Sequence, residues 1–464
     1  MTSSIFSKRQ GPRLAAVAVL LGALHGSALA ADAESPMGEE SQLTPVGAQQ
    51  AGNPAGTIPS WDGGLKAPVS GYQKGERLVD PYAEDPVLFT ITGENQQDYA
   101  ENLTEGQKAL LNRYPDSWRM NVYASHRSAA YPERVYKAVE NNRSTATAIL
   151  DGRGGVKGSA IASPFPVPES GVEVIWNHIL RWRGVHIQRM DGSAAVTRRG
   201  NYTLILQQEE WAIPYALSQS LPMQERNPNL LLAFKTKVLA PGFLTGSGLL
   251  TVDSLNHNET ARENWLYNAD LRRIIRAPFS GFDNPSPNTD ALRFTDEGDM
   301  FNGAPGLFDW KLLGKRELYI PYNAYRLESG ELTAEDIVGE EHINPDHARY
   351  ELHRVWVVEG TLKTGSGQRG HRYSRRVFYL DEDTWQIAAA DNYDADGNLW
   401  RVSEGHAVMH YQVPAPWYAL LVYHDLKEER YLVQGLDNQR RAPQFDEKIN
   451  PRLFGPNSLS FYVR

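Results

Sequence analysis

The sequence predicts an α+β fold that is mainly β, with one antiparallel sheet and a few helices that can cover it. From about Asn201 onward, short runs of β-branched and aromatic residues alternate with turn residues, which is typical of strands. Between residues 350 and 433 these runs are joined by turns of only a few residues, as in an antiparallel meander. The clearest helix-start signals come earlier, between residues 104 and 183.

The first thirty residues have the three-part layout of a secretory signal peptide. Lys8, Arg9 and Arg13 precede the short apolar run 14–24, and the small residues before Ala31 form a cleavage site. The apolar run is too short to span a bilayer as a mature helix. We therefore expect cleavage after Ala30, rather than a retained N-terminal anchor, and a mature chain that works outside the cytoplasm.

The composition excludes several classes of anchor and partner. The chain has no cysteine, so it offers neither a site for N-terminal lipidation nor a disulfide, and its core must stabilise the fold. The formal net charge is −9, and residues 1–30 hold three basic and no acidic residues, so the mature chain is more acidic still. Because an acidic surface repels phosphate groups, we expect no nucleic-acid partner. We also expect no transmembrane segment in the mature chain, since no later apolar run approaches the roughly 18 residues required.

The mature chain is predicted to consist of an extended arm followed by one large domain. Residues 31–75 are rich in Gly, Pro, Ser and Ala and show neither a helical nor a strand period. We expect this arm to wrap over the surface. Residues 76–464 are then long enough to form a single large domain with a substantial core.

Three helices are predicted in the first half of this domain. Thr104 and Gln107 have the spacing of a capping box, and Ser170 with Glu173 has the same spacing ahead of a second amphipathic run. A third, shorter helix is expected to start at Pro132 and to run towards Asn141, because proline is favoured at a helix start.

The predicted strands follow in order and end in the meander. A long stretch, 277–309, interrupts them and is rich in Gly and Pro; it is either a lid or binding loop, or a wrapped surface excursion. The Trp385 run is expected to return along its predecessor after a turn at 381–384. The strands are expected at 202–206, 231–239, 248–253, 265–267, 271–276, 350–359, 371–380, 385–393, 399–408, 419–423 and 430–433.

The sequence contains no clear catalytic or metal-binding motif. A serine-hydrolase elbow of the form Gly-x-Ser-x-Gly is absent. The spacings of His342, His347 and His353 suit neither a helical pair nor a tight strand pair of metal ligands. The acidic turn around Asp394 lacks the distal glutamate of a calcium loop. We therefore expect no catalytic residue, no metal and no cofactor.

An apolar site is the remaining possibility. A curved antiparallel sheet that does not close leaves a concave apolar surface, which helices, loops or a bound lipid can fill. The residues that we expect to line such a cavity are aromatic or aliphatic and come from a predicted helix and three predicted strands: Trp176, Ile179, Trp356, Phe378 and Trp385. The alternative is that these side chains pack against one another in an ordinary core.

Several long motifs together resemble one bacterial family, catalogued as domain of unknown function 1329 and often labelled outer-membrane lipoprotein-sorting-protein-like. They cover nearly all of the mature chain: 43–48 (LTPVGA), 56–59 (GTIP), 164–166 (PFP), 176–178 (WNH), 299–303 (DMFNG), 310–312 (WKL), 314–323 (GKRELYIPYN) and 378–385 (FYLDEDTW). The resemblance implies a Gram-negative periplasmic protein with a fold related to the carriers LolA and LolB, an open antiparallel half-barrel with helices packed in or across its concave face. It also implies a gene neighbourhood that includes transporters of the resistance-nodulation-division type. The family has no established catalytic residues.

These observations lead to one hypothesis and two alternatives. The leading hypothesis is a soluble, non-enzymatic periplasmic carrier or binding protein for a lipid, a lipoprotein or another hydrophobic molecule, which serves an envelope transport system. The first alternative is an envelope hydrolase, which needs a polar constellation in a cleft. The second is a non-catalytic adaptor of a resistance-nodulation-division transporter.

Overall fold

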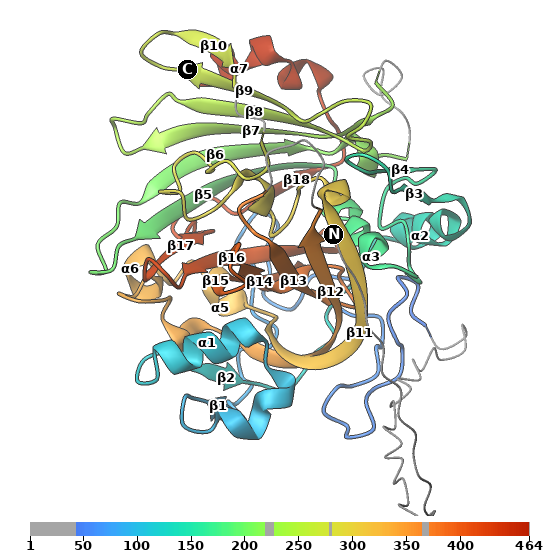
Figure 1. Ribbon diagram of the computed structural model, residues 1–464, viewed down its shortest axis with the longest axis vertical. Coiled ribbons are helices and arrows are strands. Elements are labelled where there is room, and N and C mark those ends of the chain that lie inside the picture. Colours follow the sequence, from blue (N-terminus) through green and yellow to red (C-terminus); the bar gives the residue numbers. More distant parts are fainter. Residues whose placement is uncertain (1–42, 219–226, 278–280, 364–370, 464) are drawn as a thin grey trace, which may run out of the picture. The chain divides into compact units, whose positions relative to one another are not determined.

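The computed structural model describes residues 43–218, 227–277, 281–363 and 371–463 (Figure 1). The predicted signal peptide, its cleavage site and residues 31–42 of the predicted arm lie outside the described residues. In the part of the chain that is described, no helix has both the length and the apolar character needed to cross a bilayer.

Strands make up most of the regular structure, as predicted. The strands are β1 (Phe89–Ile91), β2 (Met120–Val122), β3 (Thr147–Ile149), β4 (Gly155–Lys157), β5 (His186–Val196), β6 (Ile205–Ala212), β7 (Leu230–Ala240), β8 (Gly248–Ser254), β9 (Glu263–Asn268), β10 (Arg273–Arg276), β11 (Phe308–Pro321), β12 (Tyr350–Leu362), β13 (Arg375–Asp381), β14 (Ile387–Tyr393), β15 (Leu399–His410), β16 (Ala415–Asp425), β17 (Arg430–Gln434) and β18 (Gln444–Asp446). The α-helices are α1 (Glu105–Arg113), α2 (Glu133–Thr145), α3 (Gly171–Leu180), α5 (Tyr325–Glu328), α6 (Ala334–Ile337) and α7 (Leu459–Tyr462). Short 3-10 turns include η2 (Gln96–Asn102), η3 (Pro214–Ala216), η4 (Thr295–Glu297), η5 (Pro305–Leu307), η6 (Pro345–His347), η7 (Pro451–Phe454) and η8 (Pro456–Ser458).

One 16-stranded sheet organises the chain. Its strand order is β1-β2-β12-β13-β14-β15-β16-β17-β5-β6-β7-β8-β9-β10, while β11 pairs with β12 and β18 pairs with β5. The neighbours are antiparallel except for one parallel contact, where Val122 of β2 meets Tyr350 of β12. Among the described strands, β1 and β10 end the path and do not pair with each other, so the antiparallel sheet stays open.

The predicted strands are mostly confirmed, but seven strands were not predicted: the long strands β5 and β11 and the short strands β1 to β4 and β18. The runs that became β7 to β10 and β12 to β17 are strands within a few residues of the predicted bounds. The predicted strand 202–206 is wrong in its position, since β6 begins only at Ile205. Strands β5 and β11 were not predicted, because polar residues in β5 and the register shift between Leu312 and Gly314 in β11 hide the alternation.

The predicted helices are present, although one cap differs. Thr104 and Gln107 form the expected capping box at the start of α1. Helix α3 starts at the predicted place, but the Ser170 side chain makes no capping bond, and Glu173 Oε2 instead accepts from Glu169 N at 2.6 Å. Helix α2 starts after Pro132, as predicted, and is longer than expected.

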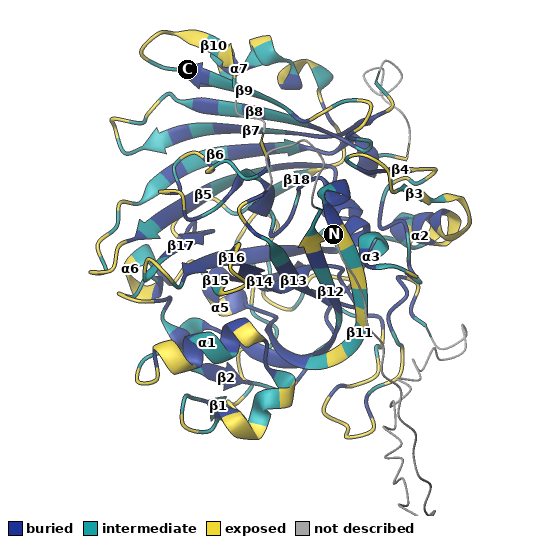
Figure 2. Cartoon of the chain, in the orientation of Figure 1, coloured by how far each residue is buried: buried dark blue, intermediate teal, exposed yellow. Residues whose placement is uncertain are grey.

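Two hydrophobic clusters lie on opposite faces of the central strands. Along β16, Leu421 and Tyr423 belong to the cluster that contains α3, whereas Leu420 and Val422 belong to the cluster that contains α1. Helix α3 contacts β11 and β12, and α1 contacts β14 and β15. We call these two groups the α3 cluster and the α1 cluster. The central strands are therefore buried on both faces, as the dark blue strands of Figure 2 show.

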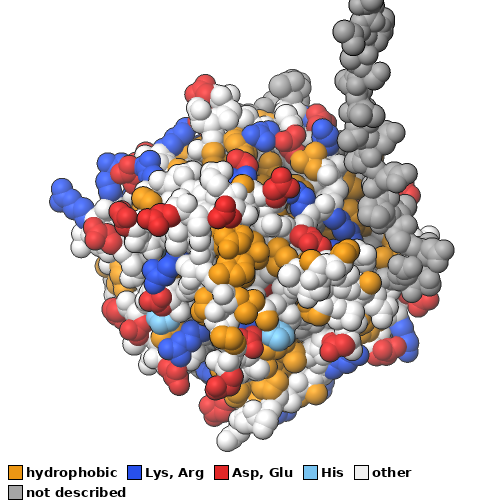
Figure 3. Space-filling model, turned by 90° about the horizontal axis from the view of Figure 1, so that it is seen from below, with side chains coloured by type: hydrophobic (Ala, Val, Ile, Leu, Met, Phe, Trp, Pro, Cys, Tyr) orange, Lys and Arg blue, Asp and Glu red, His pale blue; other side chains and the backbone are white. Residues whose placement is uncertain are grey.

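Segment 277–309, of which 278–280 lie outside the described residues, contributes to the interior. Its η4 and η5 turns flank buried aromatic residues, and Phe294 and Phe301 are fully buried. On the face seen in Figure 3, acidic and basic side chains of the described residues are interspersed with hydrophobic ones rather than gathered by sign.

Candidate functional site

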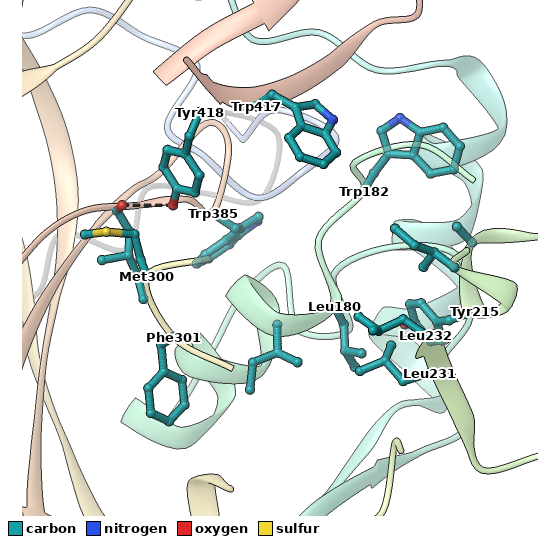
Figure 4. Close-up of a cluster of buried hydrophobic side chains, with 14 of the residues drawn as sticks. Leu180, Trp182, Tyr215, Leu231, Leu232, Met300, Phe301, Trp385, Trp417 and Tyr418 are labelled. Atoms are coloured by element: carbon teal, nitrogen blue, oxygen red, sulfur yellow. Dashed lines mark hydrogen bonds between the residues drawn. The ribbon is translucent and has the colours of Figure 1, made fainter. Parts of the chain in front are cut away.

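The five residues predicted to line an apolar cavity come together in the α3 cluster. Four of them, from α3, β13 and the turn before β14, are at most 6% exposed, and Trp356 on β12 is half-buried. The rings of Trp356 and Trp385 are nearly parallel, with centroids 6.2 Å apart. Figure 4 shows Trp385 close to Tyr418 and Trp417. The Tyr418 hydroxyl donates to the Ile387 carbonyl at 2.9 Å. In this structure the five residues contact protein, and their contact with a ligand stays a prediction.

Two cavities in the interior are small and lie elsewhere. Each has room for about one water molecule, about 10 Å³. None of the five predicted residues lines either cavity. A long acyl chain therefore enters this core only if part of the α3 cluster moves.

A second apolar surface lies beside the α3 cluster and is partly open. Its five side chains come from five successive strands, β6 to β10: Trp211, Phe234, Leu249, Leu266 and Ile275. Trp211 pairs with Phe234, and Leu249, Leu266 and Ile275 form one row across β8, β9 and β10. Thr236 pairs with Leu249 and is two residues from Phe234 on β7, so both rows lie on one face. We call this surface the apolar face.

The apolar face is half-exposed and continuous with the core. Ile275 is 42% exposed, and the other four side chains are half-buried. The Trp211 ring lies 4.3 Å from the Phe234 ring and 6.1 Å from that of Trp417, which belongs to the α3 cluster. Figure 2 shows intermediate exposure along β8 and β9, in contrast to the buried central strands.

The opposite face of the same strands is covered by the C-terminal segment. Lys235, adjacent to Phe234 and therefore on the other face, is fully buried, and its Nζ donates to the Leu453 carbonyl at 2.8 Å. A Cβ added at Gly248, on this covered face, would lie 2.4 Å from Val463. The sheet between β6 and β10 therefore has one closed and one partly open face.

A charged cluster borders the apolar face. Glu209 is two residues from Trp211 on β6, so it shares that face, and it accepts from Arg189 Nε at 2.7 Å and from Trp211 Nε1 at 3.3 Å. Asp191 lies 3.8 Å from Arg189, and burial together with Glu209 raises the pKa of Asp191 to about 7. The surface is therefore amphipathic, with apolar rows next to groups that can hydrogen-bond a polar head.

Segment 281–309 is fixed over the α3 cluster by buried ion pairs. Asp299 pairs with Arg181 at 2.6 Å and also with Arg183. Burial opposes ionisation of Asp299, but the two arginines lower its pKa to about 2. His178 Nε2 donates to the Asp299 carbonyl at 2.8 Å and Nδ1 accepts from Ile387 N. Burial and Arg181 lower the pKa of His178 to about 3, so the imidazole is neutral.

A second polar group joins the same segment to β13 and to the residue His371 that precedes it, at a place where a hydrolase would need polar side chains. Asp296 Oδ2 accepts from Arg376 Nη1 at 2.7 Å and lies 3.1 Å from His371 Nε2. His371 Nδ1 accepts from the Tyr373 backbone N–H at 3.0 Å. These side chains are almost fully buried, and the bond between Arg376 on β13 and Asp296 holds the segment in place.

Comparison with known proteins identifies the family. The family described as "Protein of unknown function (DUF1329)" matches residues 90–460. The chain belongs to the DUF1329 family. The uncharacterized protein PA3922 of Pseudomonas aeruginosa is 44% identical to it over 434 residues, which cover 93% of this chain and 94% of that protein.

Solved structures similar to this DUF1329 chain have low sequence identity. A domain from Vibrio parahaemolyticus, described as a candidate outer membrane lipoprotein-sorting protein, has 13% identity and a TM-score of 0.43 and covers 62% of this chain and 98% of its own. A DUF1329 family protein from Desulfovibrio piger has 13% identity and a TM-score of 0.42, covering 62% and 97%. The LolA superfamily protein NE2245 from Nitrosomonas europaea has 12% identity and a TM-score of 0.37, covering 62% and 98%.

The residues of the apolar face in this DUF1329 chain were not among those predicted from the sequence. Trp211 and Phe234 are no more apolar than Trp176 or Phe378, and both pairs sit in regular elements. What separates the pairs is the cover that segment 281–309 and α3 provide, and that cover has no periodic signal in the sequence. The pairing register across β6 to β10 is needed to see that these side chains share one face of the sheet.

Proposed function

We propose that this DUF1329 protein is a periplasmic binding protein or carrier for a lipid or another hydrophobic molecule. The bound molecule lies on the apolar face. The observation that carries this proposal is the half-exposed row of Leu249, Leu266 and Ile275 beside Trp211 and Phe234, continuous with a buried aromatic core. On a soluble protein, a contiguous apolar surface that is partly exposed usually marks a place where a ligand or partner binds.

The energetics favour a long apolar ligand with a polar head. Each methylene that leaves water for this surface contributes about 0.8 kcal/mol. The head group would lie near Arg189 and Glu209, whose side chains are hydrogen-bonded and therefore preorganised. Movement of segment 281–309 would extend the site to Trp176, Ile179, Trp356, Phe378 and Trp385, which the sequence predicted as ligand-binding residues.

The cellular setting of the proposal comes from the sequence. The predicted signal peptide indicates export, and the absence of cysteine excludes the usual lipid anchor, so the carrier would shuttle within the periplasm. The same proposal includes an open half-barrel with helices across its concave face. It also includes an envelope transporter of the resistance-nodulation-division type as partner. Both parts rest on the family resemblance.

The test is ligand binding by the purified mature protein. Organic extracts of protein prepared from its native envelope are expected to contain a co-purifying amphiphile by mass spectrometry, and delipidated protein is expected to bind a dansyl-labelled fatty acid. Leu249→Asp and Leu266→Asp place a charge on the apolar face and are expected to weaken binding at least about tenfold, which corresponds to 1.4 kcal/mol.

Leu271→Asp is the matched control, because Leu271 lies in the β9–β10 turn, is 61% exposed and is not part of the apolar face. This variant is expected to bind like the wild type. Absence of any co-purifying or added amphiphile, or equal binding by all three variants, would refute the proposal.

A further inference from the structure

A group of buried ligand-type side chains lies at the β12–β13 end of the sheet, away from the apolar face. His353 comes from β12, Asp381 ends β13, and Asp383 lies in the turn that follows. One ligand atom from each of the three lies within 4.8 Å of the others, and each residue is at most 2% exposed. His353 Nδ1 and Asp381 Oδ1 are 3.8 Å apart, which is beyond hydrogen-bond distance.

The imidazole of His353 is oriented as metal-binding histidines usually are. Its Nε2 donates to Glu351 Oε2 at 3.1 Å, and Glu351 is itself held by Arg349 Nε at 2.6 Å and by the His126 backbone N–H at 2.8 Å. This bond places the proton on Nε2, so the Nδ1 lone pair faces Asp381. A carboxylate behind a histidine fixes its tautomer and raises its basicity as a ligand.

Asp381 is the carboxylate of this region that lacks a cationic partner. Asp383 forms two bonds with Arg127, at 2.7 and 2.8 Å, and Glu382 pairs with Arg354 and Lys315. Within the described residues no lysine or arginine forms an ion pair with Asp381. Its Oδ2 accepts from the N–H and hydroxyl of Thr384, and its Oδ1 has no hydrogen-bond partner. A buried carboxylate without a counter-charge is costly unless a proton or a metal ion neutralises it.

The surroundings of the group contain further unsatisfied polar atoms. The water-sized cavity next to it is lined by Tyr322, Asn323, Thr384 and Gln386. Gln386 is 1% exposed, and neither atom of its side-chain amide has a partner. The Tyr322 hydroxyl is also unpartnered, and the Tyr322 ring lies 4.0 Å from that of His353. These atoms can bind a water molecule that takes part in the coordination of a cation.

We propose that His353, Asp381 and Asp383 bind a divalent first-row metal ion such as Zn²⁺ or Mn²⁺, with water on the side of Tyr322 and Gln386. A ligand set of one imidazole and two carboxylates suits these ions better than Ca²⁺, which takes six to eight oxygen ligands. Zinc binds such nitrogen and oxygen atoms at about 2.0–2.2 Å, so two ligands of one ion can lie up to about 4 Å apart. Asp383 can coordinate while it stays bonded to Arg127, because each carboxylate oxygen has two lone pairs.

The site also lies where the N-terminal arm meets the sheet. Glu382, between the two aspartates, accepts from Gln49 N at 3.2 Å, and Arg354 Nη2 donates to the Ala51 carbonyl at 2.7 Å. A metal ion held by Asp381 and Asp383 would fix this turn, and with it the docking place of the arm. The proposal is independent of ligand binding on the apolar face, since it concerns different residues.

The experiment is a titration of the metal-free, full mature chain with Zn²⁺ and with Mn²⁺ by calorimetry, with thermal unfolding recorded in parallel. We expect about one equivalent of metal per chain and a higher midpoint of unfolding with metal. Asp381→Asn is expected to weaken binding at least tenfold. Substitution of Co²⁺ is expected to give visible d–d bands from a nitrogen and oxygen ligand set, and these bands are expected to vanish in the Asp381→Asn variant.

Asp391→Asn is the matched control. Asp391 is also a fully buried carboxylate whose pKa is raised to about 7 by burial, but its partners are Tyr379 and the Gly106 N–H, and it is not one of the three proposed ligands. It is expected to bind metal like the wild type. If Asp381→Asn does not fold by circular dichroism, His353→Gln takes its place. Absence of stoichiometric binding by the wild type, or undiminished binding by a folded ligand variant, overturns the proposal.

Discussion

The ion pairs of Asp299 allow a quantitative test of how segment 281–309 is held in place. Asp299→Asn removes one carboxylate and leaves Arg181 and Arg183, which are 4% and 5% exposed, without their counter-charge. The pKa of Asp299 falls from 3.8 to about 2 on folding, which corresponds to about 2.5 kcal/mol of stability. Breaking a buried pair typically costs about 3–5 kcal/mol, so we expect a loss of about 3 kcal/mol at pH 7.

The assay is urea denaturation of the wild type and the variant from pH 7 down to pH 2. Because the pKa of Asp299 is depressed in the folded state, its contribution is present above pH 4 and is lost as the pH falls towards 2. The difference between the two proteins should therefore shrink over that interval. Asp290→Asn, which removes an exposed pair with Arg430, is the control and should change stability by less than about 0.5 kcal/mol. A loss below 1 kcal/mol for Asp299→Asn would refute this account of the segment.

Three further predictions concern the helix cap, the core and the pH dependence. Thr104→Ala removes the capping box of α1 and should lower stability by about 1 kcal/mol in urea denaturation; an unchanged midpoint would contradict it. Phe301→Ala empties a fully buried site against Phe378 and should cost about 3–5 kcal/mol by the same assay, and a loss under 1 kcal/mol would show that the site collapses freely. Burial raises the pKa of Glu404 to about 7, so its contribution is present below pH 4.5 and is lost as the pH rises through 7. Glu404→Gln lacks this pH dependence, so its free energy of unfolding should rise by about 2–3 kcal/mol relative to that of the wild type between pH 5 and pH 8. A constant difference in unfolding free energy between the two proteins would argue against the raised pKa.

Local signals in the sequence were enough to locate most elements. Each of these signals depends on a few neighbouring residues: the capping box of Thr104 and Gln107, the proline before α2 and the turns of the C-terminal meander. The predictions based on them are confirmed. Strand β5 could not be found this way, because Arg189, Asp191 and Gly192 interrupt its apolar pattern. The charge of Arg189 is paired with Glu209, which lies on the next strand, so the local sequence does not explain it.

The candidate sites needed contacts between distant parts of the chain. Whether an aromatic side chain is covered depends on segment 281–309, which has no period, so the sequence could not separate Trp176 from Trp211. The 381–384 segment was correctly predicted as a turn, but nothing local places Asp381 opposite His353. That arrangement follows from the pairing of β12 with β13, in which Val355 meets Asp381.

The pairing of β17 with β5 has a consequence for how the chain folds during synthesis. Tyr431 pairs with Val196, so one edge of β5 finds its partner only after nearly the whole chain has emerged. Until then β5 offers unpaired backbone groups to any other strand, and closing so distant a contact is slow. Truncation before residue 430 would leave that edge permanently without β17, and aggregation would then compete with folding.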